Sequence, residues 1–254
     1  MKTLKKWVAA AAMVGLAGAA QAGLVNRGNG MIYDSTRNIT WLADMNYAKT
    51  SGYDGDGRMT WSQAKAWADN LTFGGYSDWR LPTLNPADTT CSNNFNAGGS
   101  FGQQYYGYNC SGGELSGLFV TDLGNKAGQS VLNQTGDTPE QIANLALFSN
   151  VQSYRYWSGL EFAPVSSYAW FFNTNIGFQD YVGKDFELYA VAVRPGDVAA
   201  AVPEPQTLAL VMMAFGAAMV ACAGCGRPGA ERCRASRWRN WTGAWLGWWP
   251  RAGR

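Results

Sequence analysis

The sequence contains no histidine, and this absence narrows its chemistry more than any residue type that is present. Ser-His-Asp and Cys-His catalysis, His-ligated zinc and the usual general base near neutral pH are all excluded. Charge is also sparse, because Asp, Glu, Lys and Arg make up 15% of the chain. An enzyme on this chain would have to use carboxylates, Tyr or Lys. We therefore expect a non-enzymatic protein with no cofactor and no metal site.

The chain begins with the pattern of a secretory signal peptide over residues 1–22. Lysines near the start precede an uncharged apolar run, and the segment ends in the small-x-small triplet Ala20-Gln21-Ala22. This order predicts export by the Sec route, with cleavage after Ala22. A retained membrane anchor is the alternative, but the apolar run is short for a span of about 20 residues.

A second apolar segment, residues 207–224, carries no charge. At about 1.5 Å per residue a helix of this length reaches roughly 27 Å, close to a bilayer core of about 30 Å. Arginines follow the segment, as expected on the cytoplasmic side of a membrane. A transmembrane helix is therefore predicted, and a buried helix of a soluble domain is the alternative.

Pro203-Glu204-Pro205 stands directly before this segment. The tripeptide, the apolar span and the basic residues, together residues 203–226, resemble the PEP-CTERM sorting signal of Gram-negative bacteria that make exopolysaccharide. The resemblance implies recognition by a membrane exosortase and a transient inner-membrane anchor. It also implies cleavage near the motif and delivery to the cell surface or extracellular matrix.

Residues 227–254 depart from that family, whose signals end soon after the basic cluster. This tail holds five tryptophans interleaved with arginines. We expect it to be disordered and to be removed with the sorting signal. A peptide that binds nucleic acid or a membrane surface is the alternative.

Residues 23–202, between the two signals, are long enough for one domain with its own core. This stretch has ten Lys and Arg against sixteen Asp and Glu, a net charge of −6, although the whole chain carries +2. The acidic balance argues against nucleic acid as a partner. Only Cys91 and Cys110 lie in this stretch, and an oxidising compartment favours a disulfide between them over two free thiols.

The start of the domain predicts a β-hairpin, because apolar residues alternate on both sides of the polar residues 34–38. Asp54-Gly-Asp56-Gly then resembles part of a calcium loop. The residues after it lack the remaining oxygen ligands, which favours a glycine-rich turn. Thr60 and Gln63 form a capping box for a helix that we expect to end before Gly74-Gly75.

The next segment, "SDWRLP", predicts a strand that ends at Pro82. Alternation places Trp79 and Leu81 on the core face. Asp78 and Arg80 then share the opposite face, where they can form an ion pair with each other.

Residues 85–113 predict a long, nearly uncharged loop bracketed by the two cysteines. Its Phe, Tyr, Asn and Gln residues suit a sugar, which stacks on rings and bonds to amides. The candidate ligand-binding residues are Tyr105, Tyr106, Tyr108 and Asn109, with Trp157 and Trp170 nearby. A surface loop without a ligand and two tryptophans in the core are the simpler alternatives.

The second half of the domain predicts a helix that starts at Pro139 and Glu140, followed by three or four strands. Turns are expected at residues 173–177 and near Gly183. Helices in the first half and strands in the second indicate an α+β domain.

Seven motifs occur in order between about residues 28 and 198: "ITWLAD", "MTWSQAKAWADNL", "GGYSDWRLPT", "GELSGLF", "YWSG", "AWFF" and "AVAVRPGD". Together they resemble the Lcl C-terminal domain family of bacterial surface proteins, especially the subgroup with a PEP-CTERM signal. The resemblance implies a single compact C-type-lectin-like domain, with two or three short helices and a mostly antiparallel twisted sheet. The namesake adhesin binds sulfated polysaccharides, but the acidic balance here argues against a polyanion.

Two relatives of that fold fit less well. Formylglycine-generating enzymes use two cysteines near the C-terminal part of the domain, and this chain has none between Cys110 and Cys222. Calcium-dependent lectins use Glu-Pro-Asn and Trp-Asn-Asp motifs, which are absent too.

Three functions remain in view. The first is a non-enzymatic adhesion module that binds extracellular polysaccharide or a surface glycan. The second is a structural matrix protein that binds other proteins or itself. The third is a glycosidase with two carboxylates about 5–10 Å apart, for which Asp54 with Asp56 and Asp185 with Glu187 are the nearest candidates.

Overall fold

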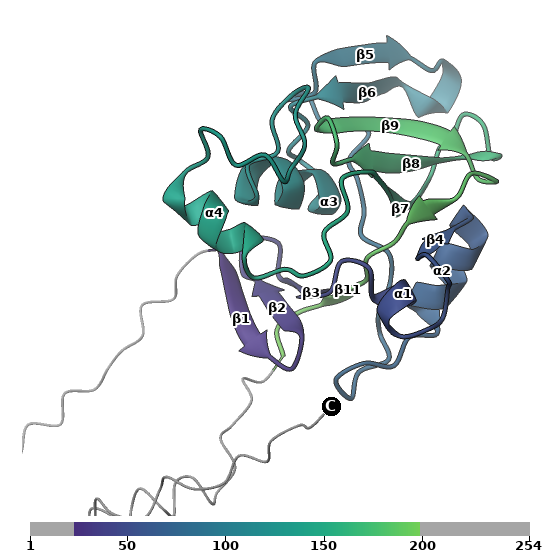
Figure 1. Cartoon of the computed structure of the whole chain (residues 1–254). Helices are drawn as coiled ribbons and strands as arrows, with labels where there is room; N and C mark the ends of the chain where they lie inside the picture. The colour runs from purple at the N-terminus through teal and green to yellow at the C-terminus, as the bar shows by residue number, and fades with distance from the viewer. Residues whose placement is uncertain (1–22, 199–254) are drawn as a thin grey trace, which may run out of the picture. The chain divides into compact units, whose positions relative to one another are not determined.

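Two sheets and a few short helices make up residues 23–198, the part of the chain that this computed structural model describes (Figure 1). The strands are mostly antiparallel, so the expected α+β class is confirmed. The signal peptide, the sorting signal with its apolar segment, and the tail lie outside the described residues. None of the helices within residues 23–198 has the length and apolar character needed to cross a membrane.

The smaller sheet has the strand order β1-β2-β3-β11. Its strands are β1 (Leu24–Gly28), β2 (Met31–Asp34), β3 (Ile39–Leu42) and β11 (Val193–Pro195). The expected opening hairpin is β2 and β3, in which Ile32 lies opposite Trp41. Because β11 pairs with β3, the two ends of the domain meet in this sheet.

The larger sheet has the strand order β4-β10-β7-β8-β9-β6-β5. Its strands are β4 (Arg58–Met59), β5 (Asn93–Asn96), β6 (Gln103–Tyr108), β7 (Arg155–Glu161), β8 (Tyr168–Asn173), β9 (Phe178–Gly183) and β10 (Leu188–Tyr189). Only β10 and β7 pair in parallel among the described strands. The expected turns after β8 and β9 are both present.

The helices are short. They are α1 (Tyr47–Thr50), α2 (Trp61–Asp69), α3 (Glu114–Ser116) with a π-helix at Gly117–Asp122, a 3-10 turn at Gly99–Phe101, and α4 (Pro139–Leu145). The predicted helix starts at Thr60 and Pro139 are confirmed. The N–H of Thr60 donates to Gln63 Oε1 at 3.0 Å, which is half of a capping box.

The helix α2 ends at Asp69, before Gly74-Gly75 as predicted, but its C-cap is Asn70 and the glycine pair does not close it. Phe73 and Tyr76 instead exchange two backbone hydrogen bonds of 3.0 Å around Gly74 and Gly75. Both glycines have positive φ (62° and 84°), which this tight turn requires.

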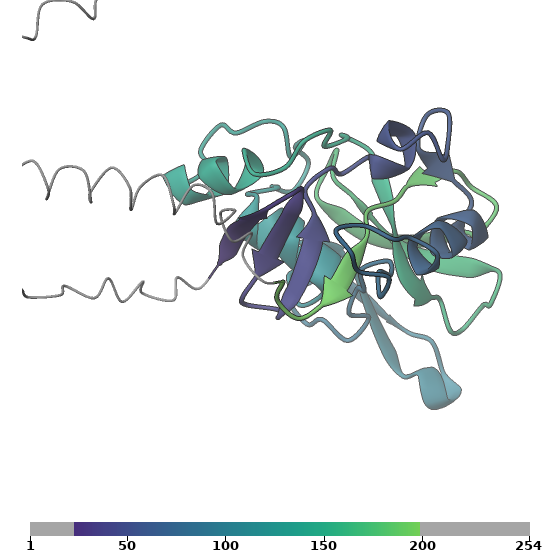
Figure 2. The same cartoon turned by 90° about the horizontal axis from the view of Figure 1, so that it is seen from below.

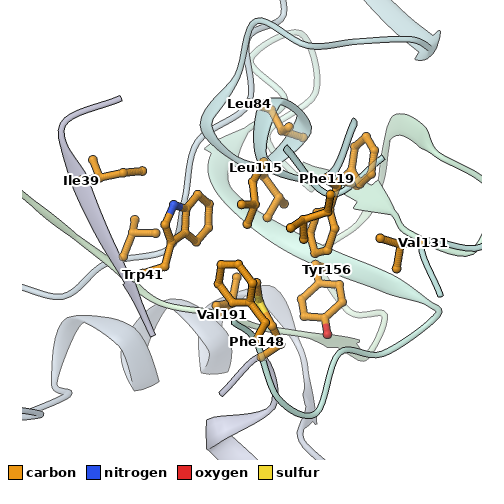
Figure 3. Packing of buried hydrophobic residues seen from close by; sticks show 14 of the residues in the cluster. Ile39, Trp41, Leu84, Leu115, Phe119, Val131, Phe148, Tyr156 and Val191 are labelled. Atoms are coloured by element: carbon orange, nitrogen blue, oxygen red, sulfur yellow. The ribbon is translucent and has the colours of Figure 1, made fainter. Parts of the chain in front are cut away.

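Two hydrophobic clusters lie on opposite faces of the larger sheet. Figure 3 shows Leu115 and Phe119 gathered with Trp41 of β3 and Tyr156 of β7, all fully buried. This cluster joins the two sheets. On the other face, α2 packs Ala64, Trp67 and Ala68 against the sheet.

The segment "SDWRLP" is extended but forms no strand, which corrects the prediction. Its only ladder contact is a bridge between Arg80 and Val193. Trp79 and Leu81 are buried, as expected. Asp78 and Arg80 do not pair with each other, because each of them pairs with a residue from a later segment. Arg194 binds Asp78 and Glu114 binds Arg80.

The predicted loop at residues 85–113 contains the β5–β6 hairpin instead. Gly107 and Tyr108 of β6 pair with β9, so the hairpin extends the larger sheet. Figure 2 shows it projecting from the body of the domain. The disulfide between Cys91 and Cys110 is present, which confirms that prediction.

Candidate functional site

An aromatic cluster centred on Tyr181 lies where the β5–β6 hairpin meets the larger sheet. Tyr181 of β9 is directly opposite Trp170 of β8, and rings from the hairpin and from residues 162–168 surround the pair. We call this set the Tyr181 cluster. Its members are Phe95, Tyr106, Phe162, Tyr168, Trp170 and Tyr181.

The rings pack in the two favoured geometries. Phe162 stacks on Tyr181 with ring centroids 3.8 Å apart and planes 9° apart. Trp170 and Tyr168 approach Tyr181 edge-on, at 5.5 and 6.2 Å. Such contacts stabilise the packing beyond the burial of area. The cluster is therefore a fixed surface, and its rings keep their orientation.

The cluster runs from the core to the solvent. Phe162 and Trp170 are buried, and Tyr168 is 39% exposed. Phe95, Tyr106 and Tyr181 are half-buried, so each shows part of its ring to solvent. An accessible aromatic surface on rigid strands is suited to stacking against the apolar face of a ligand.

Amide groups border the cluster on the hairpin. Asn93 lies opposite Tyr106 and Phe95 opposite Gln104, so alternation places these four residues on one face of the hairpin. Asn93 is exposed. Its amide offers both a donor and an acceptor beside the rings.

The phenol of Tyr181 is held in its neutral form. Burial raises its pKa, and the negative charges that Asp180, Tyr106 and Tyr168 carry when ionised raise it further. A neutral phenol can both donate and accept a hydrogen bond. The cluster thus offers polar groups as well as ring faces at neutral pH.

The base of the hairpin is fixed next to the disulfide. Asp88 accepts hydrogen bonds from the N–H groups of Ser111 (2.7 Å) and Gly112 (2.6 Å) and from the Thr90 hydroxyl (2.6 Å). Burial alone would raise the pKa of Asp88, but these bonds outweigh it and the pKa lies below its usual value. The carboxylate therefore stays ionised and holds the two ends of the hairpin together.

Asp88 and the two sulfurs lie within 4.8 Å of one another, a spacing that can hold a metal ion. The residues do not fit such an ion, because sulfurs joined in a disulfide are not thiolates. The Asp88 oxygens are also occupied by the backbone.

The structure brings together only part of the predicted ligand-binding set. Tyr106 belongs to the Tyr181 cluster, and Trp170 forms its buried base. Tyr108 packs edge-on against Phe178 at 4.7 Å instead. Asn109 is exposed in a turn with φ 63°, and Tyr105 is half-buried with its backbone N–H bonded to Pro86.

Trp157 lies away from this surface. It is fully buried on the opposite sheet face, and its Nε1 donates to Met59 O at 2.8 Å. Both tryptophans are therefore core residues, the simpler of the two interpretations of the sequence.

Four members of the cluster were not predicted from the sequence: Phe95, Phe162, Tyr168 and Tyr181. Alternation in "YAWFF" does place Tyr168, Trp170 and Phe172 on one face. Pairing across the short turn to β9 then adds Tyr181. The contribution of the hairpin could not be seen, because its pairing with β9 spans distant parts of the chain.

The carboxylate pairs considered for hydrolysis are turn residues. Asp54 Oδ1 accepts the N–H groups of Asp56 (3.0 Å) and Gly57 (2.7 Å), and Arg58 binds the Asp56 carboxylate. Asp185 and Glu187 are exposed in the turn between β9 and β10.

Ion pairs connect the sequence motifs to one another. Arg194 binds both Asp78 oxygens, at 2.8 and 3.0 Å, and its guanidinium lies 4.0 Å from the ring centroid of Tyr76. Arg37 bridges Asp34 and Asp122, both at 2.6 Å. A cavity of about 330 Å³ lies beside Arg37 and Glu114, but the charges on its wall are already paired. These residues hold the fold together.

Comparison with curated proteins gives no match. A family model described as the Lcl C-terminal domain matches residues 30–194, well over half of the chain. The match covers the larger sheet, α2, the hairpin, the Tyr181 cluster and the smaller sheet except β1 and the end of β11. The chain therefore belongs to the Lcl C-terminal domain family.

Proposed function

We propose that residues 23–202 form a non-enzymatic adhesion module that binds a glycan, and that the Tyr181 cluster is its binding surface. The observation that carries the proposal is a rigid, partly exposed set of tyrosine rings next to the exposed amide of Asn93. Sugars present apolar C–H faces and hydroxyl rims, which match rings and amides respectively. Family membership is in keeping with a surface or adhesion-type domain.

The charges favour a neutral glycan over a sulfated one. Residues 23–198 contain ten Lys and Arg, and eight of these form ion pairs with carboxylates. A ninth, Arg155, stacks on Phe171. A polyanion would need several free cations on one face, against a net charge of −6.

The proposal is tested by measuring how much of the purified protein is retained on the producer's own exopolysaccharide and on an array of neutral and sulfated glycans. Tyr168→Ala should abolish most of the retention, because it removes the most exposed ring of the cluster. Tyr53→Ala is the control, since Tyr53 is 57% exposed and outside the cluster. Equal retention of both variants, or no retention of the wild-type protein on any glycan, would contradict the proposal.

Export and sorting are part of the same proposal. The signal peptide over 1–22 and the PEP-CTERM-like residues 203–226 support delivery by the Sec route and an exosortase to the surface or matrix of a Gram-negative bacterium. Mass spectrometry of the protein from outside the cell tests this. We expect an N-terminus at Gly23 and no peptide from residues 227–254.

Self-association is the second candidate function, and one observation favours it. β5 is the edge strand of the larger sheet, and residues 89–113 around it carry no charge. Uncharged edge strands lack the usual protection against pairing with another chain. Sedimentation velocity over a range of protein concentrations, without glycan, should then show assembly that Asn93→Lys suppresses.

A further inference from the structure

A second cavity, of about 370 Å³, lies at the far end of the larger sheet from the Tyr181 cluster. We call it the α1 pocket. Its wall comes from α1, the turn before β4, residues 150–152 and β10, and the lining residues are Asn46, Lys49, Thr50, Asp56, Asn150, Gln152 and Tyr189. The volume falls within the range of about 300–1,000 Å³ typical of small-molecule sites.

Lys49 is the cation of this domain that has no partner. Each of the other nine Lys and Arg within residues 23–198 pairs with a carboxylate or stacks on a ring. No carboxylate or ring of the described residues contacts the Lys49 ammonium, although Lys49 is next to a cavity. Its three N–H donors are therefore free for a ligand.

Asp56 supplies an acceptor on the same wall. Its pKa is lowered, first by the hydrogen bond from the Arg58 N–H and then by the Arg58 side chain, so the carboxylate is ionised. Arg58 binds Oδ2 at 2.8 and 2.6 Å, and the Arg58 N–H binds Oδ1 at 2.9 Å. These bonds fix the direction of the carboxylate before any ligand arrives.

Asn46 adds a buried amide. Asn46 is 4% exposed, and its Oδ1 has no donor among the described residues. Its Nδ2 donates to Asp56 O at 3.3 Å, and its backbone N–H donates to Asp44 Oδ1 at 2.9 Å. The Asn46 Oδ1 lies against Gly57, where a Cβ would come within 1.8 Å of it. The Asn46 amide is therefore packed on the turn before β4 and holds that wall of the pocket in place.

The opposite wall is also held in place. Asn150 has a left-handed backbone (φ 54°), and its Nδ2 donates to Asp44 Oδ2 at 3.0 Å. Gln152 Nε2 donates to Asn150 O at 2.7 Å. These two bonds hold the wall in one position before a ligand binds, which is a feature of preorganised sites.

Tyr189 gives the pocket an apolar face. Its ring meets Tyr154 edge-on at 6.1 Å, and Tyr154 is 41% exposed. A ring, three amides, a hydroxyl, one cation and one carboxylate are therefore arranged around one small cavity.

We propose that the α1 pocket binds one neutral sugar unit. Lys49 donates to its hydroxyls, Asp56 accepts from them, and the sugar ring lies against Tyr189. The positive charges of Lys49 and Arg58 are balanced by the carboxylates of Asp56 and Asp44, which disfavours an anionic ligand. An ammonium in the wall disfavours a calcium ion. The pocket shares no residue with the Tyr181 cluster, so this proposal goes beyond the proposed function and can fail separately from it.

Titration calorimetry of the full chain tests the pocket, with glucose, galactose, mannose and N-acetylglucosamine as neutral probes and glucuronate and calcium chloride as charged ones. At least one neutral sugar should bind. Lys49→Met should weaken that binding about tenfold or more, because it removes a charged donor. Lys65→Met is the matched control, since Lys65 is an exposed lysine paired with Asp69 on α2.

Gln152→Leu should weaken binding in the same direction without changing the charge. Tyr168→Ala should leave monosaccharide binding intact while it reduces retention on polysaccharide. The proposal is overturned if none of the neutral sugars binds, if Lys49→Met binds as wild type does, or if only glucuronate or calcium binds. Loss of monosaccharide binding in Tyr168→Ala alone would also overturn it, by assigning the sugar to the Tyr181 cluster.

Discussion

Arg80 and Glu114 form a two-pronged ion pair, with Nη1–Oε2 and Nη2–Oε1 distances of 2.7 and 2.6 Å. The N–H of Thr83 also donates to Glu114 Oε2 at 2.8 Å. The Arg80 backbone meanwhile exchanges two 2.8 Å hydrogen bonds with Val193. One residue thus ties the extended segment 77–83 both to the start of α3 and to the last strand.

We expect Glu114→Gln to lower the free energy of unfolding by about 1–2 kcal/mol, a value reduced for the partial exposure of Arg80. The amide keeps the shape of the side chain but loses the charge and one acceptor. Urea unfolding measures the effect. Glu161→Gln is the control, because Glu161 is 45% exposed in its pair with Lys184 and should change stability by less than about 0.5 kcal/mol. Equal effects of the two variants would contradict the prediction.

The Glu114 carboxyl also makes the free energy of unfolding depend on pH. Burial alone would raise the pKa of Glu114, but the hydrogen bonds from Arg80 and Thr83 and the Arg80 charge outweigh it, so the pKa lies below 4.5. An acid with a lowered folded-state pKa stabilises the protein fully above its unfolded pKa. That contribution is lost as pH falls through the folded pKa. Below pH 4.5 the urea midpoint of the wild type should therefore fall more steeply than that of Glu114→Gln, whereas parallel curves would refute the assignment.

The disulfide gives a second prediction for stability. Cys91 and Cys110 are 19 residues apart. Removing a disulfide that closes a loop of this length lowers the free energy of unfolding by about 3 kcal/mol. The double variant Cys91→Ala/Cys110→Ala should melt roughly 6–12 °C lower than the oxidised wild type. Reductant should lower the melting temperature of the wild type and leave that of the double variant unchanged. A reductant effect that persists in the variant would assign the stabilisation to other cysteines.

Gly57 gives a prediction about the wall of the α1 pocket. Its φ is +85°, and a Cβ there would lie 1.8 Å from Asn46 Oδ1. Gly57→Ala should destabilise the domain by about 1–3 kcal/mol through the backbone alone, with the clash in addition. Gly55→Ala is the matched control, because a Cβ at Gly55 meets no atom within 4 Å and Gly55 has no positive φ. Thermal unfolding of the two variants should differ clearly, and equal stability would contradict the geometry.

Local features were predictable from the sequence because their signals are short. The β2–β3 hairpin, the helix starts at Thr60 and Pro139, and the burial of Trp79 and Leu81 each depend on residues close together in the chain. The disulfide could be predicted because residues 23–202 contain only two cysteines, so only one pairing is possible.

Long-range partners were not predictable. Arg194 is 116 residues from Asp78, and no periodicity links the two. The β5 strand, "NNFN", has weak strand propensity, because Asn is depleted in strands. It is a strand only because the disulfide, Asp88 and pairing through β6 with β9 hold the hairpin in place. The Tyr181 cluster draws on β5, β6, β8, β9 and the turn after β7, so its composition depends on the whole sheet.

Glycan retention should not change between about pH 7 and pH 9 through ionisation of Tyr181, because its phenol stays neutral there. The chain has no histidine, and burial raises the pKa of the Tyr181 phenol above its usual value of 10.0. A raised pKa keeps the neutral, donating form of a phenol to higher pH. Retention on the polysaccharide, measured across this range at fixed ionic strength, tests the prediction. Tyr181→Phe serves as the control, since it keeps the ring and removes the ionisable group. A midpoint within the range that is present in the wild type and absent from Tyr181→Phe would show that the phenol ionises there.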